Sequence, residues 1–215
     1  MNQEELRNLR QDYSAAILSE KSINANPIKQ FDQWFNEAIG AKIPEPNAMT
    51  LATATSDGRP SARIVLLKGF DDNGFAFYTN YLSRKGKELA KNPNAAIVFH
   101  WIGLERQVRI EGIIEKLSKE QSEKYFHSRP KLSQIGALVS PQSQEIADRD
   151  ELESKMSQLE AEYAEKEIPK PSYWGGYILK PRLIEFWQGR QSRLHDRIVY
   201  KKIDNKNWKK VRLAP

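Results

Sequence analysis

The residues best suited to chemistry stand close together near the C-terminal end of the chain, in the segment 186–197. This segment reads Phe-Trp-Gln-Gly-Arg-Gln-Ser-Arg-Leu-His-Asp-Arg, and it holds one of only three histidines in the sequence. Guanidinium groups form paired hydrogen bonds with phosphate or carboxylate, and an indole ring stacks on flat rings. The segment therefore suits a planar anionic ligand, and the alternative interpretation is a solvated basic loop.

The histidine of this segment, His195, is open to three interpretations. It could be a general base, a hydrogen-bond donor to a substituent on a ring, or a structural residue, and one histidine among polar neighbours does not separate these roles. The spacing of residues supports neither a Ser-His-Asp arrangement nor a pair of catalytic carboxylates.

A second group of cations stands at the start of a predicted short helix. Ser83 is a suitable N-cap, which places Arg84 and Lys85 in the first helical turn, where positive charge opposes the helix dipole. A bound anion would reverse this effect, because backbone N–H groups and two cations would converge on one phosphate. Tyr78 and Thr79 could add hydroxyl donors. The alternative is that both cations bend away into water.

Two cations also flank the apolar centre of the predicted strand 61–68. A regular strand points Arg63 and Lys68 to opposite faces, so they could hold two different anions. The alternative is that both side chains extend along the surface into solvent.

Tyr125, Arg129 and Ser133 form a further polar set, with the spacing of one helix face. Pro130 breaks that pattern, since proline removes a helical hydrogen bond and clashes with the preceding turn. We therefore expect one helix to end before Pro130 and a new turn to begin there.

Composition narrows the classes of function. The 215 residues are 39% hydrophobic and 29% charged, as in a globular protein, and the net charge of +6 predicts an anionic partner. The sequence has no cysteine, which excludes disulfides, Cys-ligated metals and Cys nucleophiles, and three scattered histidines argue against a metal site. No apolar run is long enough to span a membrane, and the polar N-terminus is unlike a signal peptide, so we expect a cytoplasmic protein.

The elements that position these residues are mostly short strands joined by tight turns, which predicts antiparallel neighbours in a nearly closed barrel. Asn26 and Pro27 start a packing helix whose apolar residues recur at helical spacing. Helices are also predicted at 3–13, 83–90, 118–127, with a capping box, and 147–167. Strands are predicted at 49–54, 61–68, 75–80, 95–101, 104–117, 173–187, 197–203 and 208–213, with hairpin turns at 57–58 and 73–74.

Nine segments of the sequence resemble, in order and spacing, the pyridoxine (pyridoxamine) 5′-phosphate oxidase family. The resemblance extends from about residue 9 to the C-terminal Arg-Leu-Ala-Pro. The segments are R-I-V-L-L-K, F-Y-T-N, S-R-K, L-E-R-Q-V, K-Y-F-H-S-R-P, S-Q-I-G-A, W-G-G, F-W-Q-G and R-L-H-D-R.

This resemblance implies an α+β protein, with an antiparallel split β-barrel that binds FMN and with peripheral helices. Residues 1–45 would form an N-terminal helical segment that covers the site, and residues 46–215 the barrel with its inserted helices. The implied enzyme is a homodimer that oxidises pyridoxine or pyridoxamine 5′-phosphate to pyridoxal 5′-phosphate. Hydride passes from substrate C4′ to the flavin and O2 is reduced to H2O2, so the cofactor carries the redox chemistry. No metal, nucleic acid or membrane is implied.

The resemblance also implies roles for individual residues. Arg197 and His195 would be catalytic, with Arg197 near C4′ and His195 orienting the substrate. The implied FMN contacts are Arg63, Ile64, Val65, Leu66, Leu67, Lys68, Tyr78, Thr79, Arg84, Lys85, Gln107, Gln142, Ser143, Trp187 and Arg197. The implied substrate contacts are Arg10, Gln11, Asp12, Tyr13, Lys68, Tyr125, Arg129, Ser133, Arg193, Leu194 and His195.

Two alternatives to this function stay open at the level of sequence. One is another FMN split-barrel oxidoreductase with a different substrate, against which the sets Tyr125, Arg129, Ser133 and Arg193, His195 argue. The other is a basic nucleic-acid-binding barrel, suggested by a pI of about 9.3 and by the aromatic residues. Flavin absorbance in the purified protein would separate the two classes.

Overall fold

The computed structural model describes residues 2–8, 13–204 and 207–215 of the chain. The chain forms two compact units, each assembled from separate stretches of sequence. Unit 1 comprises Met1–Thr50, Ile97–Glu111 and Pro181–Pro215, and unit 2 comprises Leu51–Ala96 and Gly112–Lys180. The predicted division at residue 45 stays a prediction.

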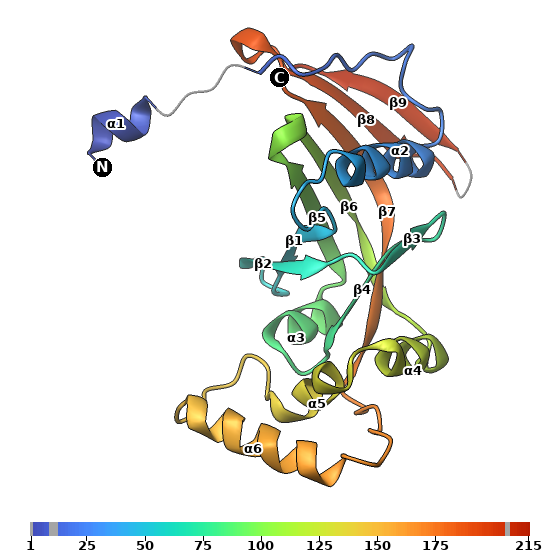
Figure 1. Ribbon diagram of the computed structural model, residues 1–215. Coiled ribbons are helices and arrows are strands. Elements are labelled where there is room, and N and C mark those ends of the chain that lie inside the picture. The colour runs from blue at the N-terminus through green and yellow to red at the C-terminus, as the bar shows by residue number, and fades with distance from the viewer. Residues whose placement is uncertain (1, 9–12, 205–206) are drawn as a thin grey trace. The chain divides into compact units, whose positions relative to one another are not determined.

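The nine described strands belong to one sheet, whose order is β2-β1-β5-β6-β7-β4-β3, with β8 paired to β7 and β9 paired to β8 (Figure 1). The pairs β3–β4, β4–β7, β7–β8 and β8–β9 are antiparallel, in agreement with the predicted antiparallel sheet. The strands are β1 Ala48–Ala54, β2 Pro60–Leu66, β3 Gly69–Asp71, β4 Gly74–Asn80, β5 Asn94–Trp101, β6 Arg106–Lys116, β7 Trp174–Gln188, β8 Asp196–Lys202 and β9 Trp208–Leu213. The helices are α1 Gln3–Arg7, α2 Pro27–Gly40, α3 Arg84–Lys91, α4 Lys119–Ser128, α5 Lys131–Val139 and α6 Arg149–Glu162, with 3-10 turns η1 Ile102–Leu104 and η2 Gln191–Arg193.

The core of unit 1 includes the buried face of α2. Asn26 caps this helix as predicted, because its Oδ1 accepts a hydrogen bond from the backbone N of Ile28 at 2.7 Å. Trp34 is buried and meets the ring of Phe186 edge-on, at 5.2 Å between centroids. The aromatic residues of α2 therefore pack as the helical periodicity predicts.

Three helices of unit 2, α4, α5 and α6, share a second apolar cluster. Phe126 of α4, Ile135 of α5 and Trp174 at the start of β7 are buried in it. The predicted apolar face of the last helix packs against this cluster through Leu152, Met156, Leu159 and Tyr163. Figure 1 shows α6 lying along α5, with which it is in contact. The helix is shorter than predicted, because Asp148 caps it at one end and it stops before Tyr163.

The hairpin before β4 differs from the prediction. The predicted strand 61–68 ends at Leu66, and β3 is a separate short strand. Asp71 pairs with Gly74, so the turn is one residue earlier than the predicted 73–74. Gly74 has φ +143°, and a Cβ there would lie 2.1 Å from the backbone oxygen of Leu179, so the close approach of β7 requires glycine.

The predicted helix caps and the predicted N-terminal helix can also be compared with the structure. The capping box of Ser118 and Gln121 is confirmed at the start of α4, and Ser83 is confirmed as the N-cap of α3. The helix predicted at 3–13 is described only as α1, Gln3–Arg7, and residues 9–12 lie outside the described residues. None of the helices in the described part of the chain is long and apolar enough to cross a membrane.

Candidate functional site

A cavity of about 650 Å³ in unit 2 collects many of the residues singled out by the sequence. It is formed by β2, β4, α3, α4, α5, the loop after α5 and the first residue of β7. Its lining residues with a predicted role are Ile64, Val65, Leu66, Lys68, Tyr78, Thr79, Lys85, Tyr125, Arg129, Ser133 and Gln142. Its other lining residues, to which the sequence assigned no ligand contact, are Asn80, Pro130, Gly136, Ala137, Ser140 and Trp174.

One side of this cavity carries a cation held by neutral partners. Lys85 Nζ lies 2.8 Å from Gln142 Oε1 and 3.3 Å from Thr79 Oγ1. Burial, together with the charge of Arg63, lowers the pKa of Lys85. No carboxylate among the described residues pairs with this ammonium group, so its positive charge is not balanced within the protein and a bound anion would stabilise it.

Arg129 supplies a second cation to the same cavity. Its Nη2 donates to the backbone oxygen of Ser133 at 2.6 Å, and its guanidinium lies 4.6 Å from the centre of the Trp174 ring. Its Nη1 is buried and has no hydrogen-bond partner among the described residues. Burial lowers the pKa of Arg129, and the nearby hydroxyl of Tyr125 partly offsets this by raising it. A buried N–H group that makes no hydrogen bond is costly, so the site fits an anionic oxygen that would accept from it.

The break at Pro130 explains how one polar set reaches one cavity from two helices. α4 ends at Ser128 and α5 begins at Lys131, as the sequence predicts. Tyr125 extends from α4, where its ring stacks on Tyr78 at 3.8 Å between centroids. The cavity thus combines cations with flat aromatic rings, which suits a phosphorylated ring compound.

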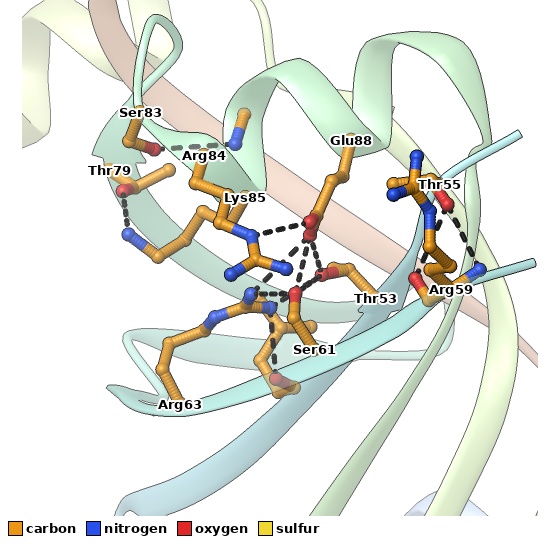
Figure 2. Close-up of polar contacts among 12 residues, drawn as sticks. Thr53, Thr55, Arg59, Ser61, Arg63, Thr79, Ser83, Arg84, Lys85 and Glu88 are labelled. Atoms are coloured by element: carbon orange, nitrogen blue, oxygen red, sulfur yellow. Dashed lines mark hydrogen bonds and ion pairs between the residues drawn. The ribbon is translucent and has the colours of Figure 1, made fainter. Parts of the chain in front are cut away.

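Arg63 and Arg84 do not line this cavity; Figure 2 shows both pointing toward the buried carboxylate of Glu88. Arg84 Nε lies 2.9 Å from Glu88 Oε1, and Arg63 Nη2 lies 3.4 Å from Glu88 Oε2. Arg84 also lines a second cavity of unit 2, of about 530 Å³, together with Ser143. Leu67, given a flavin contact by the resemblance, is buried at 5% exposure and lines neither cavity.

Unit 1 brings together the aromatic members of the predicted site. His195 lies beside Trp187, at 4.6 Å between ring centroids, and Tyr13 meets both rings edge-on at 5.8 and 5.9 Å. The backbone N of Arg190 donates to His195 Nδ1 at 3.1 Å. A neutral His195 therefore carries its proton on Nε2, which leaves that atom able to donate to a ligand.

Arg197 is fixed by a buried carboxylate on the neighbouring strand. Its Nε and Nη2 donate to the two oxygens of Glu185 at 2.7 and 3.2 Å, and its Nη1 donates to the backbone oxygen of Ala214 at 3.0 Å. The hydrogen bond to Glu185 raises the pKa of Arg197. Arg197 thus keeps its charge and its direction.

The remaining predicted residues are spread over unit 1. Arg193 and Leu194 are exposed, and Arg193 has φ +60°, a backbone conformation that non-glycine residues seldom adopt. Gln107 is half-buried on β6. Arg10, Gln11 and Asp12 lie outside the described residues. No group of three or more His, Asp or Glu side chains within the described ranges could hold a metal ion.

Two residues that hold predicted site residues in place were not singled out from the sequence. Glu88 stands four positions after Arg84, so helical spacing could have paired them. Glu185 stands between Ile184 and Phe186 in a buried strand, and a carboxylate in such a strand indicates a partner of opposite charge.

Models of two related families match the chain. Residues 35–163 match "Pyridoxamine 5′-phosphate oxidase", and residues 174–215 match "Pyridoxine 5′-phosphate oxidase C-terminal dimerisation region". A pyridoxine/pyridoxamine 5′-phosphate oxidase of Trichormus variabilis is 55% identical over 98% of each chain. The enzyme of the same name from Salinibacter ruber is 57% identical, over 98% of this chain and 99% of that one.

Solved structures share the fold. PhzG from Burkholderia lata, in complex with tetrahydrophenazine-1-carboxylic acid, has a TM-score of 0.87 at 33% identity and covers 94% of this chain and 100% of that one. An FMN-binding protein from Nostoc punctiforme has a TM-score of 0.70 at 17% identity, over 90% of this chain and 100% of that one. The fold is the predicted antiparallel α+β split barrel. The chain belongs to the pyridoxine/pyridoxamine 5′-phosphate oxidase family.

Proposed function

We propose that the cavity of unit 2 binds the phosphate groups of the flavin and of the substrate. As a member of its family, the chain is an oxidoreductase that converts pyridoxine 5′-phosphate and pyridoxamine 5′-phosphate to pyridoxal 5′-phosphate, with FMN as its cofactor. The observation that carries the assignment of the cavity is the buried, unpartnered Nη1 of Arg129 beside the stacked rings of Tyr78 and Tyr125. Membership of this family also selects the oxidase over a nucleic-acid-binding barrel.

The phosphate of FMN would be held at the start of α3. The first N–H groups of a helix have no intrahelical partner, so those of Arg84 and Lys85 are free to donate to an anion. Lys85 adds its charge, and Thr79 and Gln142 hold its ammonium group in place. These donors suit a phosphate monoester and offer nothing comparable to riboflavin, which lacks it.

The phosphate of the substrate would be held by Arg129, with Lys68, Tyr125 and Ser133 on the same cavity wall. Arg129 donates through the N–H groups of its Nη1, since its Nη2 is already engaged with the backbone of Ser133. A guanidinium gives a stronger and more directional bond to phosphate than a neutral donor does.

At the reacting end, bound FMN supplies the acceptor for the hydride that leaves substrate C4′. Arg197 would keep a fixed positive charge near that carbon, since Glu185 holds its direction. His195 would orient the substrate by donating from Nε2, and Trp187 and Tyr13 would enclose the planar ring. The accurate placement of reacting atoms is worth many orders of magnitude in rate, so these contacts matter for turnover.

The assembly and the second substrate are also part of the proposal. Residues 174–215 match a dimerisation region, which supports a homodimer, and we propose that both copies are needed for a working flavin site. We further propose that O2 reoxidises the flavin and is released as H2O2, in the cytoplasm.

The test is a turnover assay with the full-length protein and added FMN. Pyridoxine 5′-phosphate should give pyridoxal 5′-phosphate and an equal amount of H2O2, while unphosphorylated pyridoxine should react far more slowly. Equal turnover of phosphorylated and unphosphorylated pyridoxine would contradict the proposed phosphate site.

A further inference from the structure

Glu88 occupies an unusual position for a carboxylate on a helix surrounded by cations. It lies on α3, is only 6% exposed, and belongs to no part of the proposed ligand site. It accepts hydrogen bonds from the hydroxyl groups of Thr53 on β1 and Ser61 on β2, the latter at 2.7 Å. A buried carboxylate is costly unless it is paired and hydrogen-bonded, so a specific role is indicated.

The charged partners of Glu88 are two arginines from different elements. Arg84, one helical turn before it, lies 2.9 Å from Oε1, while Arg63 of β2 lies 3.4 Å from Oε2. Figure 2 shows both guanidinium groups directed at this carboxylate. Burial acts to raise the pKa of Glu88, but hydrogen bonds from Thr53, Ser61 and Arg84 and the charge of Arg63 lower it to about 2. The carboxylate is therefore ionised throughout the neutral range.

The two arginines depend on Glu88 to different degrees. Arg63 donates to Thr53 Oγ1 at 2.6 Å and to the backbone oxygen of Leu51 at 3.2 Å, so β1 fixes one side of its guanidinium and Glu88 the other. Arg84 is 64% exposed, and its contact with Glu88 is what directs its side chain. With Lys85 nearby, three cations and one carboxylate leave two net positive charges, which match a dianionic phosphate monoester.

We propose that Glu88 is a positioning residue for the cofactor phosphate, which holds Arg63 and Arg84 in a fixed arrangement beside the N-terminus of α3. This inference rests on the proposed FMN site. It adds that an acidic residue, which by charge alone would repel a phosphate, increases the affinity for it. Preorganised cations lose less conformational freedom when the ligand binds, and this gain outweighs the repulsion.

The experiment measures the affinities of the full-length apoprotein for FMN and for riboflavin, by quenching of flavin fluorescence, in wild type and Glu88→Gln. Glutamine keeps the shape and can still accept from the hydroxyl groups, but it offers one acceptor oxygen, whereas Arg84 and Arg63 contact different oxygens of Glu88. The dissociation constant of FMN should rise roughly tenfold, and that of riboflavin should change less than about twofold.

Three other results would overturn the proposal. Tighter binding of FMN by Glu88→Gln would mean that Glu88 only offsets positive charge. Equal weakening of FMN and riboflavin would mean that Glu88 serves folding alone, and unchanged affinities would mean that it has no role in binding. If Glu88→Gln fails to fold, Ser61→Ala decides in the same way, because it removes a hydrogen bond to Glu88 and leaves the charges intact.

The matched control is Glu153→Gln on α6. Arg149 and Glu153 form the same kind of ion pair, four residues apart, but at an exposed position. This variant removes the same charge and should leave both affinities unchanged. If the wild-type protein binds riboflavin as tightly as FMN, both the proposed phosphate site and the proposed role of Glu88 are wrong. If wild type prefers FMN and Glu88→Gln keeps that preference, only the proposed role of Glu88 is wrong.

Discussion

Arg197 and Glu185 form a two-point ion pair between adjacent strands, with Arg197 on β8 and Glu185 on β7. Glu185 is 2% exposed and also accepts from Arg109 Nη2 at 2.7 Å, so one buried carboxylate serves two arginines. Burial acts to raise its pKa, but the hydrogen bond from Arg197 and the charge of Arg109 lower it. Because both of its oxygens are occupied, Glu185 fixes the plane of the Arg197 guanidinium.

Glu185→Gln should therefore lower kcat while the protein keeps its flavin. The amide can accept at one oxygen only, so Arg197 loses one of its two contacts, and we expect a fall of roughly tenfold. Arg197→Met should lower kcat at least as much. Steady-state turnover and the flavin absorbance of the same samples check both statements.

The control for Glu185 is Glu111→Gln, which removes the other, more exposed partner of Arg109. It should leave kcat unchanged. A wild-type kcat in Arg197→Met under single-turnover conditions would show that Arg197 is not near the reacting carbon.

Arg129→Ala should raise KM for pyridoxine 5′-phosphate and leave FMN affinity nearly unchanged. The lost charge-assisted hydrogen bond is worth about 1.5–3 kcal/mol, so the increase should be roughly tenfold or more. Arg129→Lys should recover only part of it, because an ammonium group cannot both contact the Ser133 backbone and reach the phosphate as a fork. Loss of flavin with unchanged KM would assign Arg129 to the cofactor.

Arg212 should hold the segment after Tyr13 in place. It contacts the backbone oxygen of Leu18 at 3.0 Å and the carboxylates of Glu20 and Asp196 at 2.8 and 2.7 Å. The hydrogen bond from Arg212 lowers the pKa of Glu20 to about 2, so the pair stays charged at neutral pH.

Arg212→Met should accordingly speed proteolytic cleavage near residues 14–22 and raise KM, since Tyr13 would lose its fixed place beside Trp187 and His195. Mass spectrometry of timed digests measures the first effect. Lys209→Met, at an exposed position on the same strand, should match wild type in both assays. Equal cleavage rates for Arg212→Met and wild type would rule out an anchoring role.

Glu88 should also make stability depend on pH. Its pKa is about 2 in the folded protein and 4.5 ordinarily, so its stabilisation is complete above about pH 4.5 and is lost as the pH falls toward 2. At most this amounts to about 3 kcal/mol of unfolding free energy. The difference in that free energy between wild type and Glu88→Gln, from urea titrations, should shrink between pH 5 and pH 3; a constant difference would contradict the assignment.

Local signals in the sequence determined much of the secondary structure. The caps at Ser83 and Ser118 and the proline at 130 act through bonds that span a few residues, so the sequence contains both partners of each interaction. The turn before β4 was misplaced by one residue, because the approach of Leu179, from a strand 105 positions later, fixes the conformation of Gly74. Residue types and motif spacing also identified the family, since several long motifs occur in one order.

Only the tertiary structure decided which charges are paired. The sequence suggested that Arg63 and Arg84 are both cations for a phosphate. In the structure both contact Glu88, and Arg63 reaches it only because β2 and α3 come together. The partner of Arg197 depends on the register of β7 and β8, and the orphaned Nη1 of Arg129 depends on Trp174 lying over its guanidinium. Arg84 and Glu88 are four positions apart on one helix, but the other contacts join residues 12 to 45 positions apart. Sequence patterns do not encode the strand register and helix packing that set such distances.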